Sequence, residues 1–96
     1  MKILAIEKEV TGVKEKDFTK ELLEKEAQRA WELYQKGIFR EMYFTAESRF
    51  AVLIIEVESK REAARILDTL PLVKKKLITF EIHPLVPYDG FERLFK

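Results

Sequence analysis

The fold is decided by residues 37–72, which read GIFREMYFTAESRFAVLIIEVESKREAARILDTLPL. Residues 50–57 are apolar at both parities, which predicts a central strand that is covered on both faces. Ser59 and Glu62 follow with the spacing of a capping box, so a helix is expected to begin there. Pro71 is expected to help stop this helix after it has placed four apolar residues inward, Ala63, Ile66, Leu67 and Leu70.

Outward from this stretch, hydrophobic periodicity predicts strands at residues 2–8, 38–45 and 77–85 and a helix at residues 19–36. Thr19 is the expected N-cap of that helix, and Gly37 suits a left-handed C-cap. Its apolar stripe contains Leu23, Ala27, Ala30, Trp31 and Tyr34. The order βαββαβ predicts one α+β domain over residues 1–96, a ferredoxin-like antiparallel sheet with both helices on one face. Strands 2–8 and 50–57 would lie in the middle.

Composition bounds the class of protein. The 96 residues carry a formal net charge of +1, so no basic field points to nucleic acid or to an anionic membrane surface. Neither Cys nor Asn occurs, while Lys and Glu are abundant, which is a thermophile-like signature. No apolar run is long enough for a signal peptide or a membrane span, and a cytoplasmic protein is expected.

The second face of the sheet needs a cover. Because residues 50–57 are apolar on both sides, that face would leave an exposed apolar patch on a monomer. Packing of two sheets face to face would bury it, and the apolar tail at residues 86–96 could wrap the partner. The sequence therefore predicts a homodimer or a larger homo-oligomer.

A family likeness rests on three motifs in a shared order and spacing: Gly37-Ile38-Phe39-Arg40, the helix that begins at Ser59, and Leu70-Pro71-Leu72. Over most of residues 19–85 the chain resembles the muconolactone isomerase-like family of dimeric α+β barrel proteins. The resemblance implies sheets that pack across a dimer, and a cofactor-free enzyme that shifts a double bond in a lactone acid by proton transfer. In that family a His and later a second Arg follow the first Arg, where this chain has Glu41 and Phe44. The tail also differs, since it contains Pro87-Tyr88-Asp89-Gly90-Phe91.

Candidate ligand-binding residues are Arg40 and Tyr43 on strand 38–45. A guanidinium on a largely apolar strand can grip a carboxylate through two hydrogen bonds. The alternative is an ion pair of Arg40 with a strand glutamate that fixes the register. Tyr43, with Trp31 and Tyr88, can line a pocket for an unsaturated ligand, although aromatic stripes are more often core or interface.

Candidate catalytic residues are His83 and Glu81 on the last strand. A lone imidazole can move a proton near neutral pH, and a carboxylate in an apolar pocket can be tuned to act as a base. The alternative roles are a structural histidine and a solvated glutamate. Parity suggests that Glu7 and Glu81 share a face. One His without Cys does not indicate a metal site, and no cofactor is expected.

Two functions remain open at this stage. The first is a cofactor-free isomerase or proton-transfer enzyme for a small hydrophobic carboxylic acid or lactone. The alternative is a non-catalytic ligand-binding or structural module that acts by oligomerising. An RNA-recognition module shares the βαββαβ order but is excluded, because the first strand lacks an aromatic residue for base stacking and the charge is balanced.

Overall fold

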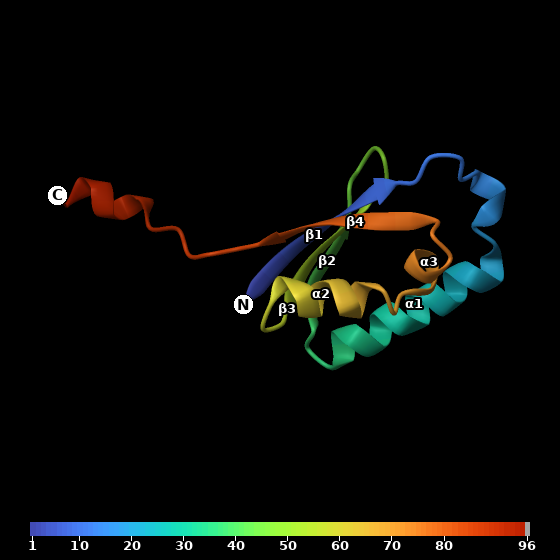
Figure 1. Ribbon diagram of the computed structural model, residues 1–96, viewed down its shortest axis with the longest axis horizontal. Helices are drawn as coiled ribbons and strands as arrows, with labels where there is room; N and C mark the ends of the chain where they lie inside the picture. The colour runs from blue at the N-terminus through green and yellow to red at the C-terminus, as the bar shows by residue number, and fades with distance from the viewer. Residues whose placement is uncertain (96) are drawn as a thin grey trace.

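The computed structural model describes residues 1–95 and shows the expected ferredoxin-like α+β architecture (Figure 1). An antiparallel sheet has the strand order β2-β3-β1-β4, which confirms that β1 and β3 are central. The helices cover one face of the sheet. The strands are β1 (Lys2–Glu9), β2 (Phe39–Phe44), β3 (Ala51–Glu56) and β4 (Ile78–Pro84). The helices are α1 (Lys20–Gln35), α2 (Lys60–Leu67) and α3 (Pro71–Lys74), with 3-10 turns η1 (Glu15–Asp17) and η2 (Gly90–Leu94).

The core lies between the sheet and the helices. Burial of one large apolar side chain stabilises the fold by about 1.5–3 kcal/mol, so this layer dominates stability. The strands contribute alternate residues, and α1 contributes Leu33, which has no exposed surface. The buried set on the helix side of the sheet includes Ile3, Ala5, Phe39, Leu53, Ile55, Ala63 and Leu67.

The helix termini follow the predicted caps with one difference. The Oγ1 of Thr19 accepts from the Leu22 amide at 3.2 Å, and Gly37 has a φ of +76° at the C-terminal end of α1. The Oγ of Ser59 accepts from the Glu62 amide at 3.1 Å. The Glu62 carboxylate accepts from the amide of Glu58 at 3.3 Å rather than from that of Ser59, so the capping box is only half formed.

Pro71 begins a helix instead of ending one, which corrects the sequence prediction. Helix α2 stops at Leu67. Leu70 takes extended dihedral angles, because the ring of a proline clashes with the preceding residue when that residue is helical. Pro71 then occupies the first turn of α3, where its missing N–H costs nothing. Both Leu70 and Leu72 remain buried.

A bulge at Arg40 changes the side-chain pattern of β2. Phe39 pairs with Ile55 and Glu41 with Ile54, so Arg40 is the extra residue. Before the bulge an odd-numbered residue, Phe39, faces the helices. After it the even-numbered residues Met42 and Phe44 face them, as their pairing with Leu53 and Ala51 requires.

The opposite face of the sheet carries no helix (Figure 1). Its centre is a row of four half-buried aliphatic residues, which we call the open-face row: Leu4 and Ile6 on β1, and Val52 and Ile54 on β3. The apolar second face that the sequence predicted is therefore present.

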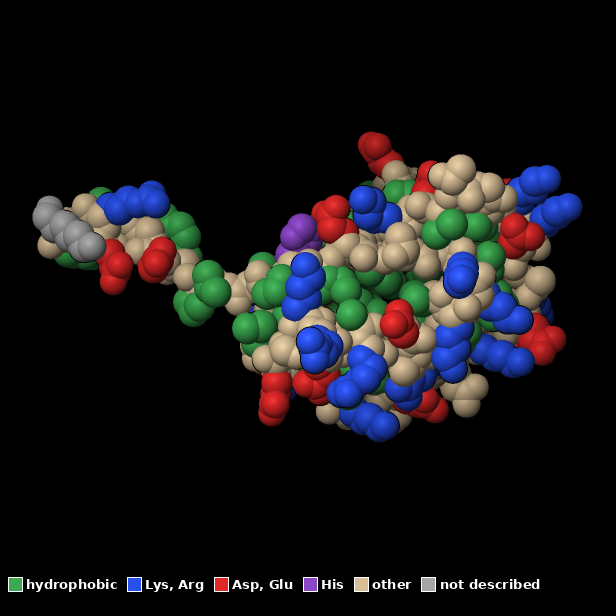
Figure 2. Space-filling model, viewed as in Figure 1, with side chains coloured by type: hydrophobic (Ala, Val, Ile, Leu, Met, Phe, Trp, Pro, Cys, Tyr) green, Lys and Arg blue, Asp and Glu red, His purple; other side chains and the backbone are tan. Residues whose placement is uncertain are grey.

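The C-terminal segment, residues 86–95, extends away from the body as a separate lobe on a narrow neck (Figure 2). Its apolar side chains are among the most exposed in the described chain: Val86, Tyr88, Phe91, Leu94 and Phe95. No helix among residues 1–95 has the length and apolar character needed to cross a membrane.

Candidate functional site

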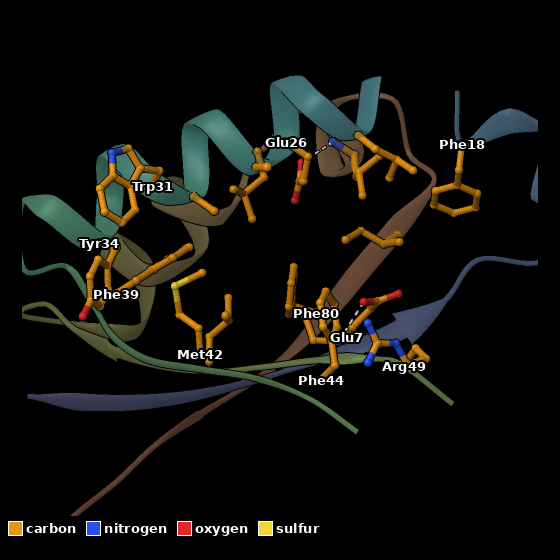
Figure 3. Close-up of a pocket in the computed structure, with 18 residues that line it drawn as sticks. Glu7, Phe18, Glu26, Trp31, Tyr34, Phe39, Met42, Phe44, Arg49 and Phe80 are labelled. Atoms are coloured by element: carbon orange, nitrogen blue, oxygen red, sulfur yellow. Dashed lines mark hydrogen bonds between the residues drawn. The ribbon is translucent and has the colours of Figure 1, made fainter. Parts of the chain in front are cut away.

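A cavity of about 690 Å³ opens between α1 and the helix side of the sheet (Figure 3). Small-molecule sites usually measure roughly 300–1,000 Å³ and have mostly apolar walls. Here the walls are apolar except for Glu7, Glu26 and Arg49. The remaining wall residues include Phe18, Leu23, Ala27, Ala30, Trp31, Tyr34, Phe39, Met42, Phe44, Leu53, Leu72 and Phe80.

Helix α1 forms the roof of this cavity. Its apolar stripe borders the cavity, and Ala30 of this stripe also packs against the core. The one fully buried residue of α1 is Leu33. Trp31 and Tyr34 stack with ring centroids 5.8 Å apart and remain 57% and 50% exposed. Arg29 ties the helix to the α2–α3 connection, since its Nε donates to the Thr69 hydroxyl at 3.0 Å. The stripe therefore has surface available for a ligand.

Two carboxyl groups enter the cavity from opposite walls (Figure 3). Glu26 descends from α1 and accepts from the Leu72 amide at 2.9 Å, while Glu7 on β1 accepts from the Ala51 amide at 2.8 Å. Burial raises the pKa of both carboxyls above the usual value, and these amide hydrogen bonds offset only part of the rise. The negative charge of Glu7 raises the pKa of Glu26 further.

Arg49 borders the same cavity from the β2–β3 turn. Its Cζ lies 4.7 Å from the centroid of the Phe44 ring, a cation–π contact. The residue has a φ of +59°, and its amide donates to the Thr45 carbonyl at 3.0 Å. Arg49 forms no ion pair with a carboxylate in residues 1–95.

The four site residues expected from the sequence do not line this cavity. Glu81 and His83 lie together on the open face, where His83 Nε2 and Glu81 Oε1 are 2.7 Å apart. The hydrogen bond with His83 lowers the pKa of Glu81. Tyr43 lies toward the other edge of that face and donates to Glu41 at 2.8 Å, which raises the pKa of Tyr43. Arg40 donates from Nε to the Gly37 carbonyl at 2.5 Å, and it makes no ion pair in the described chain.

The expected pairing of Glu7 with Glu81 on one face is wrong. The register of β1 and β4 places Glu7 opposite Phe80 and Ile6 opposite Glu81. Glu7 therefore faces the helices, and Glu81 faces away from them. The error came from the strand register, because a shift of one residue reverses the face of every side chain.

The sequence model of the muconolactone delta-isomerase family matches residues 5–90, which is most of the chain. The chain belongs to this family. A search of curated proteins gave no match. Among solved structures, the chain is similar to 5-chloro-2-hydroxyhydroquinone dehydrochlorinase from Burkholderia phenoliruptrix, in complex with 2,5-dihydroxybenzoquinone. The TM-score is 0.66 at 17% sequence identity, over 94% of this chain and 98% of that one, so the likeness concerns the fold.

This member of the muconolactone delta-isomerase family has Phe44 where the resemblance implies a second arginine. Phe44 faces the cavity, and the guanidinium of Arg49 stacks on its ring. A positive group is thus present beside that position, although it comes from the turn and not from the strand. No local sequence pattern indicates this contact, because it depends on the conformation of the turn.

Glu26 was also missed, although a signal was present. It lies three residues after Leu23 and four before Ala30, so it occupies the apolar stripe of α1. A carboxylate in such a stripe either lies at the edge of the core or lines a cavity.

Residues 1–95 contain no group of three or more His, Cys, Asp or Glu that could hold a metal ion.

Proposed function

We propose that this protein binds a small hydrophobic acid or lactone in the cavity beneath α1 and catalyses a cofactor-free proton transfer there. The observation that carries the proposal is the pair of carboxyl groups, Glu7 and Glu26, which face an apolar cavity from opposite walls and have raised pKa values. A carboxyl with a raised pKa is a better match for moving protons near neutral pH. Membership of the muconolactone delta-isomerase family supports small-molecule chemistry of this type.

The two carboxyls can divide an isomerisation between them. Glu7, ionised, takes a proton from the carbon next to a substrate carbonyl, and the electron pair of that C–H bond becomes the new C=C bond. The former double bond takes up a proton from Glu26 at its far carbon. Glu7 has then gained one proton and Glu26 has lost one, so an exchange with solvent restores the starting state. Mutual repulsion favours one protonated and one ionised carboxyl, as this mechanism needs.

The test follows the ultraviolet absorbance of small unsaturated lactones and acids during incubation with the protein. Glu7→Gln and Glu26→Gln should each lower kcat by roughly 10²–10⁴-fold, the usual contribution of a general acid or base. Glu24→Gln is the matched control, because Glu24 is exposed on the same helix and does not line the cavity. Full turnover in both cavity variants would overturn the proposed mechanism.

The alternative location for proton transfer is the Glu81–His83 pair on the open face of the sheet. His83→Ala, Glu81→Gln, Arg40→Ala and Tyr43→Phe are measured beside the cavity variants. If His83→Ala abolishes turnover while Glu7→Gln leaves it unchanged, proton transfer belongs to the Glu81–His83 pair, and Arg40 and Tyr43 become the ligand-binding candidates again.

We also infer that the protein self-associates through the open face. The open-face row leaves four aliphatic side chains only partly buried, and the C-terminal segment leaves five large apolar side chains in solvent. A second copy of the chain offers both a matching sheet face and a surface for the segment. A sedimentation measurement that gives only the monomer mass at micromolar concentration would contradict this inference.

A further inference from the structure

We propose that Arg49 selects ligands that carry a carboxylate, by holding that group at the sheet end of the cavity. The proposal rests on the proposed use of the cavity and specifies which ligands enter it. It does not depend on which carboxyl group moves the proton.

Arg49 is the only cationic residue among the cavity walls in the described chain. Its charge has no carboxylate within ion-pair distance in residues 1–95, although Glu7 borders the same cavity. Arg49 is exposed, so water solvates its charge when the cavity is empty. A ligand carboxylate in the cavity would replace part of that water and pair directly with the guanidinium group.

The orientation of the side chain suits that partner. Arg49 lies over the Phe44 ring, so the ring covers a face of the guanidinium group. The N–H groups lie along the edge of a guanidinium plane, where they can bind both oxygens of a carboxylate in parallel. The backbone hydrogen bond from Arg49 to Thr45 and the stack on Phe44 both limit the freedom of this residue, so little order is lost on binding.

The ends of the cavity differ in chemistry. Arg49 and Phe44 lie at one end, where Phe44 pairs with Ala51, whose amide holds Glu7. Figure 3 shows Trp31 and Tyr34 far from Arg49, at the other end. A ligand with its carboxylate at Arg49 would therefore direct its apolar body toward the stacked rings. The two glutamates disfavour a second negative charge on that body, so the favoured class is an apolar monocarboxylate.

Binding is measured without catalysis. Trp31 is the single tryptophan and lines the cavity, so its fluorescence reports occupancy. Phenylacetate and its neutral analogue phenylacetamide serve as probes at pH 7. The wild-type protein should bind phenylacetate about tenfold more tightly, as expected for one charged hydrogen-bonded contact. Arg49→Gln should remove this preference and leave the affinity for phenylacetamide unchanged.

Arg61→Gln is the matched control, because Arg61 is an exposed arginine on α2 that does not line the cavity. It should keep the preference for phenylacetate. Arg49→Lys keeps the charge without the planar fork and should give an intermediate preference, provided its melting temperature matches the wild type.

The outcomes separate the two proposals. Binding of both probes without preference, or a preference that survives Arg49→Gln or is lost in Arg61→Gln, would overturn the role of Arg49 and leave the cavity as a ligand site. Failure of the wild-type protein to bind either probe would overturn the cavity as a site for small acids and the role of Arg49 with it.

Discussion

Glu26 occupies a position where the spacing of α1 calls for an apolar residue. Its carboxyl is partly desolvated, and one amide hydrogen bond, from Leu72, compensates only part of that cost. A leucine at this position would bury more apolar surface and avoid the desolvation of a charge. The glutamate is thus a stability cost at the roof of the cavity, which is the pattern expected when a group serves a ligand and not the fold.

The raised pKa of Glu26 makes stability depend on pH. A carboxyl whose pKa is higher in the folded than in the unfolded protein binds more protons when folded. Its contribution to stability is therefore full below the ordinary pKa of 4.5 and is lost as the pH rises through the folded pKa. Glu26→Gln removes this dependence while its amide oxygen can still accept from Leu72. The melting temperature of the variant minus that of the wild type should be larger at pH 7 than at pH 5.

Glu24→Gln provides the comparison, since it removes an exposed carboxylate from the same helix. Glu7→Gln should show the same sign as Glu26→Gln, because burial raises the pKa of Glu7 as well. A difference for Glu26→Gln that is the same at both pH values would show that the cavity does not desolvate this carboxyl.

At the scale of elements, α1 is fully buried only at Leu33 and borders the cavity along its apolar stripe. Leu33 is completely buried, whereas Leu23 at the cavity wall is 45% exposed. The C-terminal part of α1 is therefore packed closely in the core, while the part near Leu23 leaves room for the cavity.

Two substitutions test that asymmetry. Leu33→Ala should destabilise the fold by roughly 2–5 kcal/mol, because it leaves a void among buried side chains. Leu23→Ala should cost less than about 1 kcal/mol, because its side chain is partly in solvent already. Urea unfolding of the two variants gives the comparison, and equal losses would mean that α1 packs closely along its whole length.

The elements show what local sequence can predict. The doubly apolar strand β3, the Thr19 and Ser59 caps and the left-handed Gly37 follow from patterns within a few residues, so they were predictable. The bulge at Arg40 and the faces of Glu7 and Glu81 depend on the register between strands that are far apart in the chain. The same holds for the cavity: Glu26, Glu7 and Arg49 come from a helix, a strand and a turn, and only the tertiary fold brings them to its walls.

At the scale of the whole molecule, the chain has a body and a projecting C-terminal segment, with overall extents of 56 × 28 × 22 Å. The hydrogen bonds and the ring contact within residues 86–95 are internal: Asp89 with Glu92, Glu92 with Phe95, and Tyr88 with Phe91, whose centroids are 5.1 Å apart. A preformed apolar segment without a support in its own protomer is the arrangement expected for a contact with another copy.

Removal of the segment tests its part in assembly. A chain that ends at Leu85 should keep its helix and strand content by circular dichroism. Its sedimentation should show fewer copies per assembly than that of the full chain. A more conservative variant, Phe91→Ser with Phe95→Ser, should weaken the assembly in the same direction. If both variants sediment as the full chain does, the open-face row alone holds the copies together.

The projection of residues 86–95 also separates two events in time. Because the hydrogen bonds within residues 86–95 are internal to the segment, the body can fold in a first-order step whose rate does not depend on protein concentration. The proposed docking of the segment on another copy would be second order and would follow as a slower phase in dilute solution. A newly folded chain would display its exposed aromatic side chains during that interval, so we expect the risk of aggregation to be highest then.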